Sequence, residues 1–575
     1  MFEDLDLPAV DPATPVDEVV SMLCADGMPF ATKTANIRGY DMQTFVNLPA
    51  NLRDVWHILL AHGDKEYLVY GDERISFTET VSKASQLSQA LVQDYGVKKG
   101  DCVALAMRNY PEWPMAYMAI VAAGGVAVLM NAWWAEEELE WAMKDCGAVV
   151  AVTDGPRGAH IRATQKDIPI IVVRDALPAG AAVSFGDAIA DKTPLKWPEV
   201  ELGPNDIAMM PYTSGSTGFP KGAYSDHRAV ISVIFTWICI ALSLKMLGRT
   251  NPDPNFQTKM LVAVPFFHVT GLLPVMMVSA VIGRKLVLMH KWDVEEALRL
   301  VEAEGITTFT GVPTMSYEMA KSPVREKYDT STLTDIGGGG AARPPEHVRM
   351  IRDAFEGANP GIGYGLTETN AIAAMMSGDE YLERPKSTGR PTPPLVELQI
   401  QDADGNEVPQ GERGEICIKS VVNVVGYWNN TEATERAFKD GWFHSGDVGY
   451  LDEAGYVYIV DRIKDIIIRG GENISSLEVE GILHGHPDVA DVMVFSLPCT
   501  RMGEIVGAAI VPKSEHFNEQ EVLAEAGKHI AQFKLPERIW LRDEPLPLIA
   551  SGKIDRQGIR THYQKLWEAE QKETD

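Results

Sequence analysis

The chain contains little cysteine, and its cysteines are not arranged in pairs. Six cysteines are scattered through 575 residues, and no two of them have the C-x-x-C spacing. Structural zinc sites use such paired spacings, and small secreted domains need a denser disulfide framework. Both classes are therefore excluded. We expect reduced cysteines that serve as small apolar residues of a cytoplasmic protein.

Positive charge is also scarce. The sequence has 52 lysines and arginines against 80 aspartates and glutamates, which gives a formal net charge of −28. A protein that binds nucleic acid needs a basic surface to neutralise phosphates, so nucleic-acid partners are excluded. Because the field of the whole chain repels anions, any bound nucleotide must be held by backbone dipoles and a few selected cations.

The sequence lacks a long uninterrupted apolar run. Of three apolar-rich stretches, Pro114–Ala135 is broken by two adjacent glycines and Leu261–Gly283 by prolines and glycine. The third, Ala229–Leu244, has 16 residues, fewer than the roughly 20 that cross a bilayer. We therefore expect buried core segments and no transmembrane segment. The acidic start of the chain is also unlike the basic start of a secretory signal peptide.

Short runs rich in β-branched residues alternate with helical patterns in the first two thirds of the chain. A helix is predicted near Glu112–Ala123, and strands are predicted over Val103–Met107, Val126–Met130, Val149–Thr153, Ile170–Val173, Lys285–Met289 and Thr307–Phe309. Such alternation predicts an α/β fold with mixed, mostly parallel sheets covered by helices. Ligands in these folds bind beyond the carboxyl ends of strands.

The pattern changes at about residue 390. Leu398–Gln401, Gly414–Lys419 and Gly455–Val460 alternate apolar with polar or small residues and are separated by turn sequences. This period of two predicts an antiparallel β subdomain. After residues 461–465 the chain returns to a mixed pattern that ends in a polar helix, which predicts a small C-terminal α+β domain.

The segment Tyr212–Gly222, Y-T-S-G-S-T-G-F-P-K-G, combines hydroxyls, glycines and one lysine. Glycines expose backbone N–H groups that a phosphate can occupy, and Lys221 adds a positive charge. The segment is not a Walker A loop, because Pro220 precedes the lysine and Gly222 takes the place of the magnesium-binding hydroxyl. It predicts a polyphosphate-binding loop, with a flexible Gly/Ser linker as the alternative.

Two further segments carry carboxylates beside glycines. In Gly361–Asn370, Tyr364 is suited to stacking on a nucleobase and Glu368 to holding Mg²⁺, although T-E-T also suits the start of a helix. In His444–Gly449, Asp447 is expected to follow a tight turn. A carboxylate there suits either two ribose hydroxyls or a capping role in a hairpin.

Two segments near the C-terminus carry cations. Asp461–Asn473 is dense in charge, and Ser551–Arg556 places Lys553 on a glycine-containing turn. Taken alone, each is typical of solvated surface. The five segments together, in this order, resemble the adenylate-forming superfamily, which includes acyl-CoA synthetases, 4-coumarate-CoA ligases, firefly luciferases and peptide-synthetase adenylation domains. The resemblance extends from about residue 50 to residue 560.

The resemblance implies an AMP-forming acid–thiol ligase that uses ATP, Mg²⁺ and coenzyme A. A carboxylate first attacks ATP to give an acyl adenylate and pyrophosphate, and a thiol then takes the acyl group. It implies a large adenylation domain over residues 1–460, a hinge at 461–465 and a mobile lid domain over 466–575. Within the first, it implies two α/β subdomains and a β subdomain from about residue 390. A homodimer is one expectation for the assembly.

The resemblance also implies roles for single residues. Catalytic roles fall to Thr367, Glu368, His268 and Lys553, and magnesium ligation to Glu368 and Thr217. ATP binding falls to Thr213, Ser214, Gly215, Ser216, Thr217, Gly218, Lys221, Gly338, Gly339, Gly340, Ala341, Tyr364, Gly365, Asp447 and Arg462. Lys464 is the implied hinge, and CoA binding falls to Gly470, Gly471 and Glu472. One departure from the family pattern is Ile549, which occupies a position commonly held by threonine.

The implied acyl pocket is apolar or neutral, and comprises Phe235, Trp237, His268, Val269 and Gly311. This favours a hydrophobic acid, either a medium-chain fatty acid or an aryl acid. The alternatives are an enzyme that passes the acyl group to a carrier protein, a luciferase-like oxygenase, and a binding protein that keeps the fold without catalysis.

Overall fold

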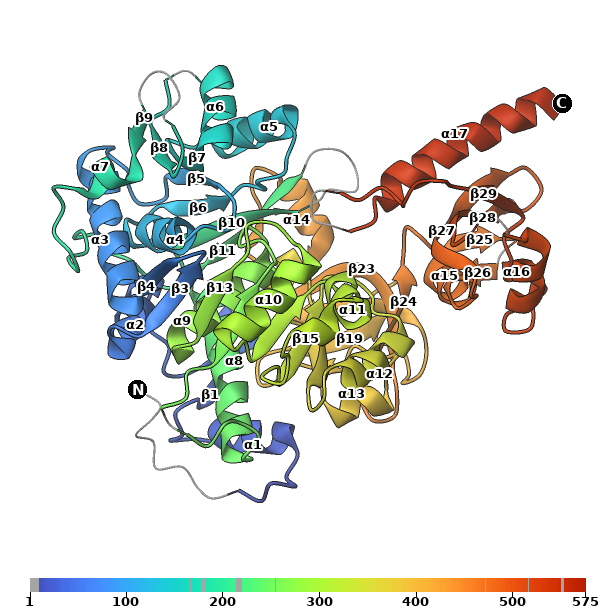
Figure 1. The fold of residues 1–575 in the computed structure, drawn as a ribbon, viewed down its shortest axis with the longest axis horizontal. Helices are drawn as coiled ribbons and strands as arrows, with labels where there is room; N and C mark the ends of the chain where they lie inside the picture. The colour runs from blue at the N-terminus through green and yellow to red at the C-terminus, as the bar shows by residue number, and fades with distance from the viewer. Residues whose placement is uncertain are drawn as a thin grey trace. The chain divides into compact units, whose positions relative to one another are not determined.

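The computed structural model describes residues 10–165, 167–176, 182–213, 220–253, 255–470, 472–514, 517–549 and 553–574. The chain divides into two compact units (Figure 1). The first comprises residues 1–398 and 418–443, and the second residues 399–417 and 444–575.

The first unit contains an eight-stranded sheet in the order β21-β11-β10-β6-β5-β7-β8-β9. Strands β10, β6, β5, β7, β8 and β9 are parallel to their neighbours in this order, whereas β11 and β21 are added antiparallel at one edge. The strands are β5 (Cys102–Ala106), β6 (Val126–Leu129), β7 (Val150–Asp154), β8 (Ile170–Val173), β9 (Ala182–Ser184), β10 (Ile207–Thr213), β11 (Lys221–Asp226) and β21 (Gly426–Tyr427).

A nine-stranded sheet in the same unit has the order β18-β17-β16-β15-β14-β12-β13-β3-β4. Its central strands, from β16 to β3, are parallel. The strands are β3 (Glu66–Tyr70), β4 (Glu73–Ser76), β12 (Lys259–Val262), β13 (Lys285–Leu288), β14 (Thr308–Gly311), β15 (Asp335–Gly339), β16 (Asn359–Tyr364), β17 (Ala374–Ser377) and β18 (Arg390–Pro391).

Side chains alternate between the two faces of each sheet and so build three apolar layers. In β5, Val103 and Leu105 join the central core, whereas Ala104 joins an outer core with α5 and α6. In β12, Met260 joins the central core and Leu261 a second outer core. Because parallel strands are buried on both faces, they read as continuous apolar runs in the sequence. Figure 1 shows α5 and α6 on one side of the eight-stranded sheet, and α3 and α4 on the other.

The helices of the first unit cover these sheets. They are α1 (Val16–Leu23), α2 (Leu52–Leu59), α3 (Phe77–Gln93), α4 (Glu112–Ala122), α5 (Glu136–Cys146), α6 (Gly155–Thr164), α7 (Phe185–Ile189), α8 (His227–Met246), α9 (Val278–Ile282), α10 (Val294–Glu304), α11 (Pro313–Lys321), α12 (Pro345–Ala354), α13 (Asp379–Glu383) and α14 (Thr431–Ala437). Helix α8 is long and apolar enough to cross a membrane, but 72% of its apolar window is buried inside the fold, as in a core helix. An N-terminal hairpin, β1 (Thr32–Ile37) and β2 (Tyr40–Phe45), completes the unit.

An antiparallel sheet follows the change of pattern near residue 390. It contains β19 (Glu397–Gln401), β20 (Gly414–Lys419), β22 (Phe438–Lys439), β23 (Trp442–Leu451) and β24 (Val457–Arg462). The C-terminal sheet contains β25 (Ile467–Arg469), β26 (Glu472–Ile474), β27 (Val489–Cys499), β28 (Gly503–Pro512) and β29 (Arg538–Leu541). Its helices are α15 (Ser476–His484), α16 (Glu519–Ala526) and α17 (Arg556–Thr574).

The predicted fold class is confirmed: an α/β unit with mixed sheets, an antiparallel β subdomain and a small α+β C-terminal part. The six predicted strands all occur, with bounds within one or two residues of the prediction, and Ile170–Val173 matches in full. The domain limits at 461–465 stay a prediction.

Candidate active site

The predicted phosphate loop is carried by the hairpin of β10 and β11. Strand β10 ends at Thr213 and β11 begins at Lys221, and these two residues pair across the hairpin. The residues between them that were predicted to bind phosphate lie outside the described residues: Ser214, Gly215, Ser216, Thr217 and Gly218. Their phosphate contacts, and Thr217 as a metal ligand, stay predictions.

Lys221 and Glu368, predicted from two separate motifs, both contact Tyr427. The Nζ of Lys221 is 4.8 Å from the centroid of the Tyr427 ring, a cation–π distance. The Tyr427 hydroxyl donates a hydrogen bond of 2.6 Å to Oε1 of Glu368. Burial, followed by the negative charge of Glu368, raises the pKa of Tyr427 far above its usual value. The hydroxyl therefore remains a donor at any physiological pH.

Tyr427 is not predicted from the sequence. It lies in the two-residue strand β21, which pairs with β11 so that Tyr427 stands opposite Ala223. A lone aromatic before a tryptophan carries no spacing that marks it as functional. Its role becomes visible only when β21 is placed at the edge of the sheet beside the strand of Lys221.

A single turn of 3-10 helix, Thr367–Thr369, presents Glu368 directly after β16. The alternative interpretation of T-E-T was the start of a helix. The segment does form helical structure, but only this one short turn. The backbone N–H of Val424 donates to the carbonyl of Glu368 at 2.9 Å. The side-chain amide of Asn370, which has a φ of 49°, donates to the carbonyl of Val422 at 2.7 Å. The turn is therefore fastened to the segment that leads to Tyr427.

The carboxyl ends of the parallel strands β15 and β16 carry bare backbone. Gly339 and Gly363 are partners across these strands, and a Cβ on Gly363 would meet no heavy atom within 4 Å. The predicted ATP-binding residues Gly338, Gly339, Gly340 and Ala341 lie at and just after the end of β15, and Tyr364 and Gly365 at the end of β16. Peptide planes without side chains suit a flat base, and strand ends of this kind are where α/β folds bind ligands.

A buried arginine holds this glycine-rich turn. Arg343 is 7% exposed and donates to the carbonyl of Gly361 at 3.1 Å. A Cβ on Gly338 would lie 2.2 Å from its Nη2 atom. The absence of a side chain at Gly338 is therefore what allows the guanidinium to pack beneath the turn. Desolvation lowers the pKa of Arg343.

The second unit holds Asp447 and Arg462, which are both predicted to bind ATP. Asp447 in β23 and Arg462 in β24 face each other across the antiparallel ladder, and Nε of Arg462 lies 2.8 Å from Oδ1 of Asp447. The predicted tight turn before Asp447 is wrong, because residues 442–451 form one strand. The strand is distorted at Gly446, whose φ is 72°. This distortion accounts for the glycine that resembled a turn signal.

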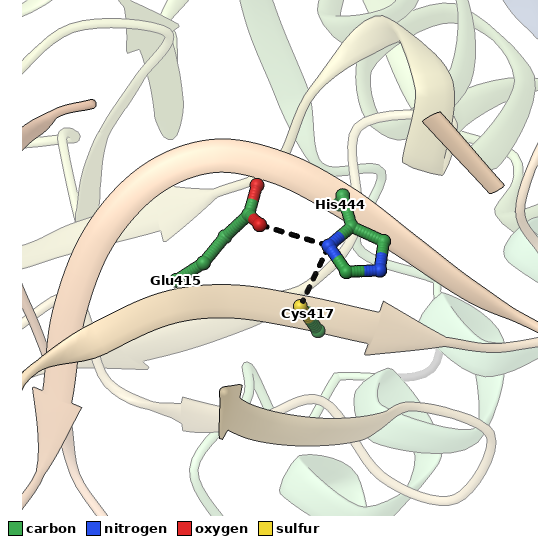
Figure 2. A group of neighbouring side chains, drawn as sticks. All are labelled: Glu415, Cys417 and His444. Atoms are coloured by element: carbon green, nitrogen blue, oxygen red, sulfur yellow. Dashed lines mark hydrogen bonds and ion pairs between the residues drawn. The ribbon is translucent and has the colours of Figure 1, made fainter. Parts of the chain in front are cut away.

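Three side chains fasten β23 immediately before Asp447 (Figure 2). Nδ1 of His444 lies 2.8 Å from Oε2 of Glu415 and 3.5 Å from Sγ of Cys417. All three ligand atoms lie within 4.8 Å of one another, and this donor set is of the kind that binds zinc. Two ligand atoms on a tetrahedral zinc, however, are separated by about 3.3 Å, so the shorter contact is that of a hydrogen bond. The other oxygen of Glu415 accepts the N–H of Gly446 at 2.9 Å.

Lys553 and Lys464 also lie in the second unit. Desolvation, followed by the positive charge of Arg462, lowers the pKa of Lys553, whereas Asp447 opposes this shift. The N–H of Ile549 donates to the carbonyl of Lys553 at 2.8 Å, so this loop is closed by backbone where the family pattern has a threonine. The carbonyl of Lys464 accepts a 2.9 Å hydrogen bond from Arg560.

The residues predicted to border CoA follow the predicted hinge at Lys464. Gly470 has a φ of 60°, and a Cβ there would lie 2.5 Å from Cε of Met502. Glu472 begins β26 and pairs with Arg469, whereas Gly471 lies outside the described residues. These contacts explain a glycine at 470 by packing, and the CoA-binding role stays a prediction.

The predicted acyl pocket residues belong to the core of the first unit. Phe235 packs against Phe30 and Phe45, with ring centroids 6.2 Å from each. Trp237 is half-buried on the same helix. His268 begins the turn before the π-helical residues Gly271–Met277, Val269 is buried, and Gly311 ends β14. Their contact with an acyl chain stays a prediction.

Comparison with known proteins gives a consistent result. The sequence matches the AMP-binding enzyme family over residues 56–428 and the AMP-binding enzyme C-terminal domain over residues 478–553. A long-chain-fatty-acid–CoA ligase of Mycobacterium tuberculosis is 31% identical over 494 residues, covering 86% of this chain and 94% of that protein. A feruloyl-CoA synthase of Amycolatopsis is 33% identical over 495 residues, covering 86% and 95%.

A solved structure gives the same fold. The o-succinylbenzoate CoA synthetase of Bacillus subtilis, determined with its acyl-adenylate intermediate, superposes with a TM-score of 0.76 at 26% identity, covering 90% of this chain and 99% of that chain. The predicted resemblance and the predicted enzyme class, an AMP-forming acid–thiol ligase, are confirmed. This chain belongs to the AMP-binding enzyme family, the adenylate-forming superfamily of acyl-CoA synthetases.

Proposed function

We propose that this protein is an acyl-CoA synthetase that activates a hydrophobic carboxylic acid, either a medium-chain fatty acid or an aryl acid. The observation that carries the proposal is the arrangement of Lys221, Tyr427 and Glu368. Lys221, which we propose binds phosphate, faces the Tyr427 ring, and Glu368, which we propose binds Mg²⁺, accepts the hydrogen bond of the Tyr427 hydroxyl. The family match and the relatives that ligate fatty, feruloyl and succinylbenzoyl groups support the same class.

In the first half-reaction a carboxylate oxygen of the acid attacks the α-phosphorus of ATP, and the bond to pyrophosphate breaks. Lys221 and the backbone of the phosphate loop bind the departing pyrophosphate. Thr367 contacts the α-phosphate, and Tyr364 lies against the adenine, with the strand-end glycines beside it. Lys553 bridges the carboxylate and the α-phosphate and stabilises the negative charge of the transition state.

Glu368 fits the role of a magnesium ligand. Its carboxylate is oriented by the Tyr427 hydroxyl at 2.6 Å, as metal-binding carboxylates are oriented by hydrogen bonds from surrounding groups. Bound Mg²⁺ supplies charge neutralisation at the phosphates. Asp447 and Arg462 hold the ribose hydroxyls in this proposal, and the hydrogen bonds of Glu415 and His444 keep the strand of Asp447 in place.

In the second half-reaction the sulfur of coenzyme A attacks the acyl carbon, AMP leaves, and the thiol loses its proton. We propose that the chain swings at Lys464 between the two half-reactions, so that residues 466–575 present different groups to the first domain. Gly470, Gly471 and Glu472 then border the pantetheine arm. His268, Phe235, Trp237, Val269 and Gly311 line the acyl pocket. A cytoplasmic location and a homodimer belong to this proposal.

Pyrophosphate–ATP exchange with a panel of acids tests the proposal. The panel contains acetate, octanoate, dodecanoate, palmitate, ferulate, 2-succinylbenzoate and a sterol-type acid, each with ATP, Mg²⁺ and the full chain. We expect the fastest exchange with medium-chain or aryl acids, and the acyl-CoA as product by mass spectrometry. No exchange with any acid would favour a binding protein. Exchange without acyl-CoA would favour a carrier-protein ligase or a luciferase-like oxygenase.

A further inference from the structure

The N-terminal hairpin, which precedes the family-matched residues 56–428, places an arginine at an unfavourable position. Strands β1 and β2 are joined by a two-residue turn, Arg38-Gly39, with φ values of 55° and 89°. Such turns favour Asn-Gly, because both central residues need a positive φ. A long side chain is uncommon in this backbone conformation. Its presence points to a use for the guanidinium group.

The guanidinium of Arg38 reaches three acceptors in two chain segments. Nη2 lies 2.7 Å from Oδ2 of Asp226, whose side chain is 6% exposed. Nη1 donates to the carbonyl of Asn423 at 2.8 Å and to that of Val424 at 3.3 Å. Charge-assisted hydrogen bonds of this kind are roughly twice as strong as neutral ones. A lysine, with a single point charge, does not reproduce this fork.

Both segments belong to the candidate active site. Asp226 is the last residue of β11, the strand that begins with Lys221, and its other carboxylate oxygen accepts the N–H of Ala229 at the start of α8. The second segment continues from Val424 to Tyr427. The N–H of Val424 donates to the carbonyl of Glu368. Arg38 therefore links two parts of the site. One is the segment of Asn423 and Val424, which hydrogen-bonds to Glu368, and the other is the end of β11, the strand that begins with Lys221.

The hairpin is also braced beyond Arg38. A Cβ on Gly441 would lie 2.9 Å from the ring of Tyr40, the first residue of β2. Gly441 has a φ of 83° and forms the turn between β22 and β23. The hairpin therefore packs against the chain after Tyr427 as well as before it. This packing fixes the position from which Arg38 reaches its acceptors.

We propose that Arg38 is a positioning residue for the adenylation half-reaction: it holds residues 423–427 against β11 and so sets the distances among Glu368, Tyr427 and Lys221. The inference rests on the proposed roles of Glu368 and Lys221. The N-terminal hairpin thereby contributes to magnesium-dependent catalysis. A hairpin with a purely structural role would make no such contribution.

Three variants of the full chain separate these roles. Arg38→Asn removes the guanidinium and gives the turn its preferred sequence, so the hairpin itself is not weakened. Arg38→Lys retains a charge for Asp226 but cannot serve both carbonyls. Lys33→Ala, at an exposed residue of β1, is the matched control for loss of one cation from the same hairpin.

Pyrophosphate–ATP exchange is measured over a range of free Mg²⁺, with the acid that the wild-type enzyme uses best. For Arg38→Asn we expect about a tenfold to hundredfold rise in the half-activating Mg²⁺ concentration or fall in exchange rate. We expect a smaller change for Arg38→Lys and none for Lys33→Ala. Transfer to CoA from supplied acyl-AMP should remain within about threefold of wild type in all three, and melting temperatures should agree within a few degrees.

Wild-type exchange rate and magnesium dependence in Arg38→Asn would overturn the inference and leave the proposed function intact. An equal loss of both half-reactions in Arg38→Asn and Arg38→Lys would also overturn it, because that pattern indicates a general structural role. An inactive wild-type enzyme with every acid is a different result: it removes the proposed function itself.

Discussion

The Tyr427 hydroxyl offers the sharpest test of the active site. Tyr427→Phe removes the hydroxyl that donates 2.6 Å to Glu368 and keeps the ring that faces Lys221 at 4.8 Å. A hydrogen bond to a charged group contributes about 1.5–3 kcal/mol. At 1.36 kcal/mol for each factor of ten, the loss of this hydrogen bond corresponds to a change of about 10-fold to 150-fold in the half-activating Mg²⁺ concentration. The effect of removing a hydrogen-bond partner from a metal ligand is of the same order, about 10-fold to 100-fold.

The expected result is a rise of that size in the half-activating Mg²⁺ concentration, measured by pyrophosphate–ATP exchange. At saturating Mg²⁺ the apparent KM for ATP should stay near the wild-type value, because the ring still faces Lys221. Tyr427→Leu removes both interactions. It should also raise the KM for ATP, by the factor of about 2–5 that corresponds to a partly exposed cation–π contact of about 0.5–1 kcal/mol.

Two outcomes would contradict this prediction. If Tyr427→Phe has the magnesium dependence of the wild type, the hydroxyl does not orient a metal ligand. If Tyr427→Phe and Tyr427→Leu raise the KM for ATP equally at saturating Mg²⁺, the ring does not help to place Lys221. The double variant with Glu368→Gln is the control, since without the carboxylate the loss of the hydroxyl should have little further effect on the magnesium dependence.

Three further changes test other parts of the structure. Lys553→Ala should abolish pyrophosphate exchange yet leave CoA transfer from supplied acyl-AMP largely intact, and equal loss of both steps would contradict the assigned role. Gly365→Ala should destabilise the first unit by about 1–3 kcal/mol or more, because a Cβ would lie 2.5 Å from the carbonyl carbon of Ala371; Gly363→Ala, where a Cβ meets no heavy atom within 4 Å, should leave the melting temperature unchanged. Burial lowers the pKa of His227 to about 4, below the value near 6.5 in an unfolded chain. The neutral form therefore contributes its full stabilisation above about pH 6.5. As the pH falls towards 4, up to about 3 kcal/mol of the free energy of unfolding is lost. His227→Asn should flatten that part of the stability curve in thermal melts, and an unchanged pH dependence would show that His227 is not the group responsible.

The sequence was sufficient for the strands of the parallel sheets, because burial on both faces leaves continuous runs such as Ile170–Val173. It was less informative where a glycine interrupts a strand. Gly446 resembled part of a turn before Asp447, but it distorts a ten-residue strand instead. A local pattern cannot distinguish these cases, since the strand is maintained by partners distant in sequence, including Glu415.

The motif residues of the site were predictable as types, but their neighbours were not. Glu368 and Lys221 stand in recognisable motifs, whereas Tyr427 and Arg38 stand in none. Both of the latter contact residues that are distant in sequence, as in the hydrogen bond from Arg38 to Asn423. The spacing of residues in a sequence indicates only which residues share one helix or strand. Residues that connect different elements can therefore be identified only when the fold is known.

Tyr427 contacts the charged groups of both Lys221 and Glu368. This arrangement matters in an acidic protein that binds a polyanion, because it decides whether the two charges offset each other. A lysine paired directly with a carboxylate would offer a phosphate a cation whose charge is already offset. Here the side chain of Lys221 faces the ring of Tyr427, and the carboxylate of Glu368 accepts from the hydroxyl at the far end of that ring. The ring attracts the ammonium without neutralising it, and the hydroxyl orients the carboxylate without occupying both of its oxygens. Both charges therefore remain available for the phosphate and the Mg²⁺ that we propose they bind, in a chain whose net charge is −28.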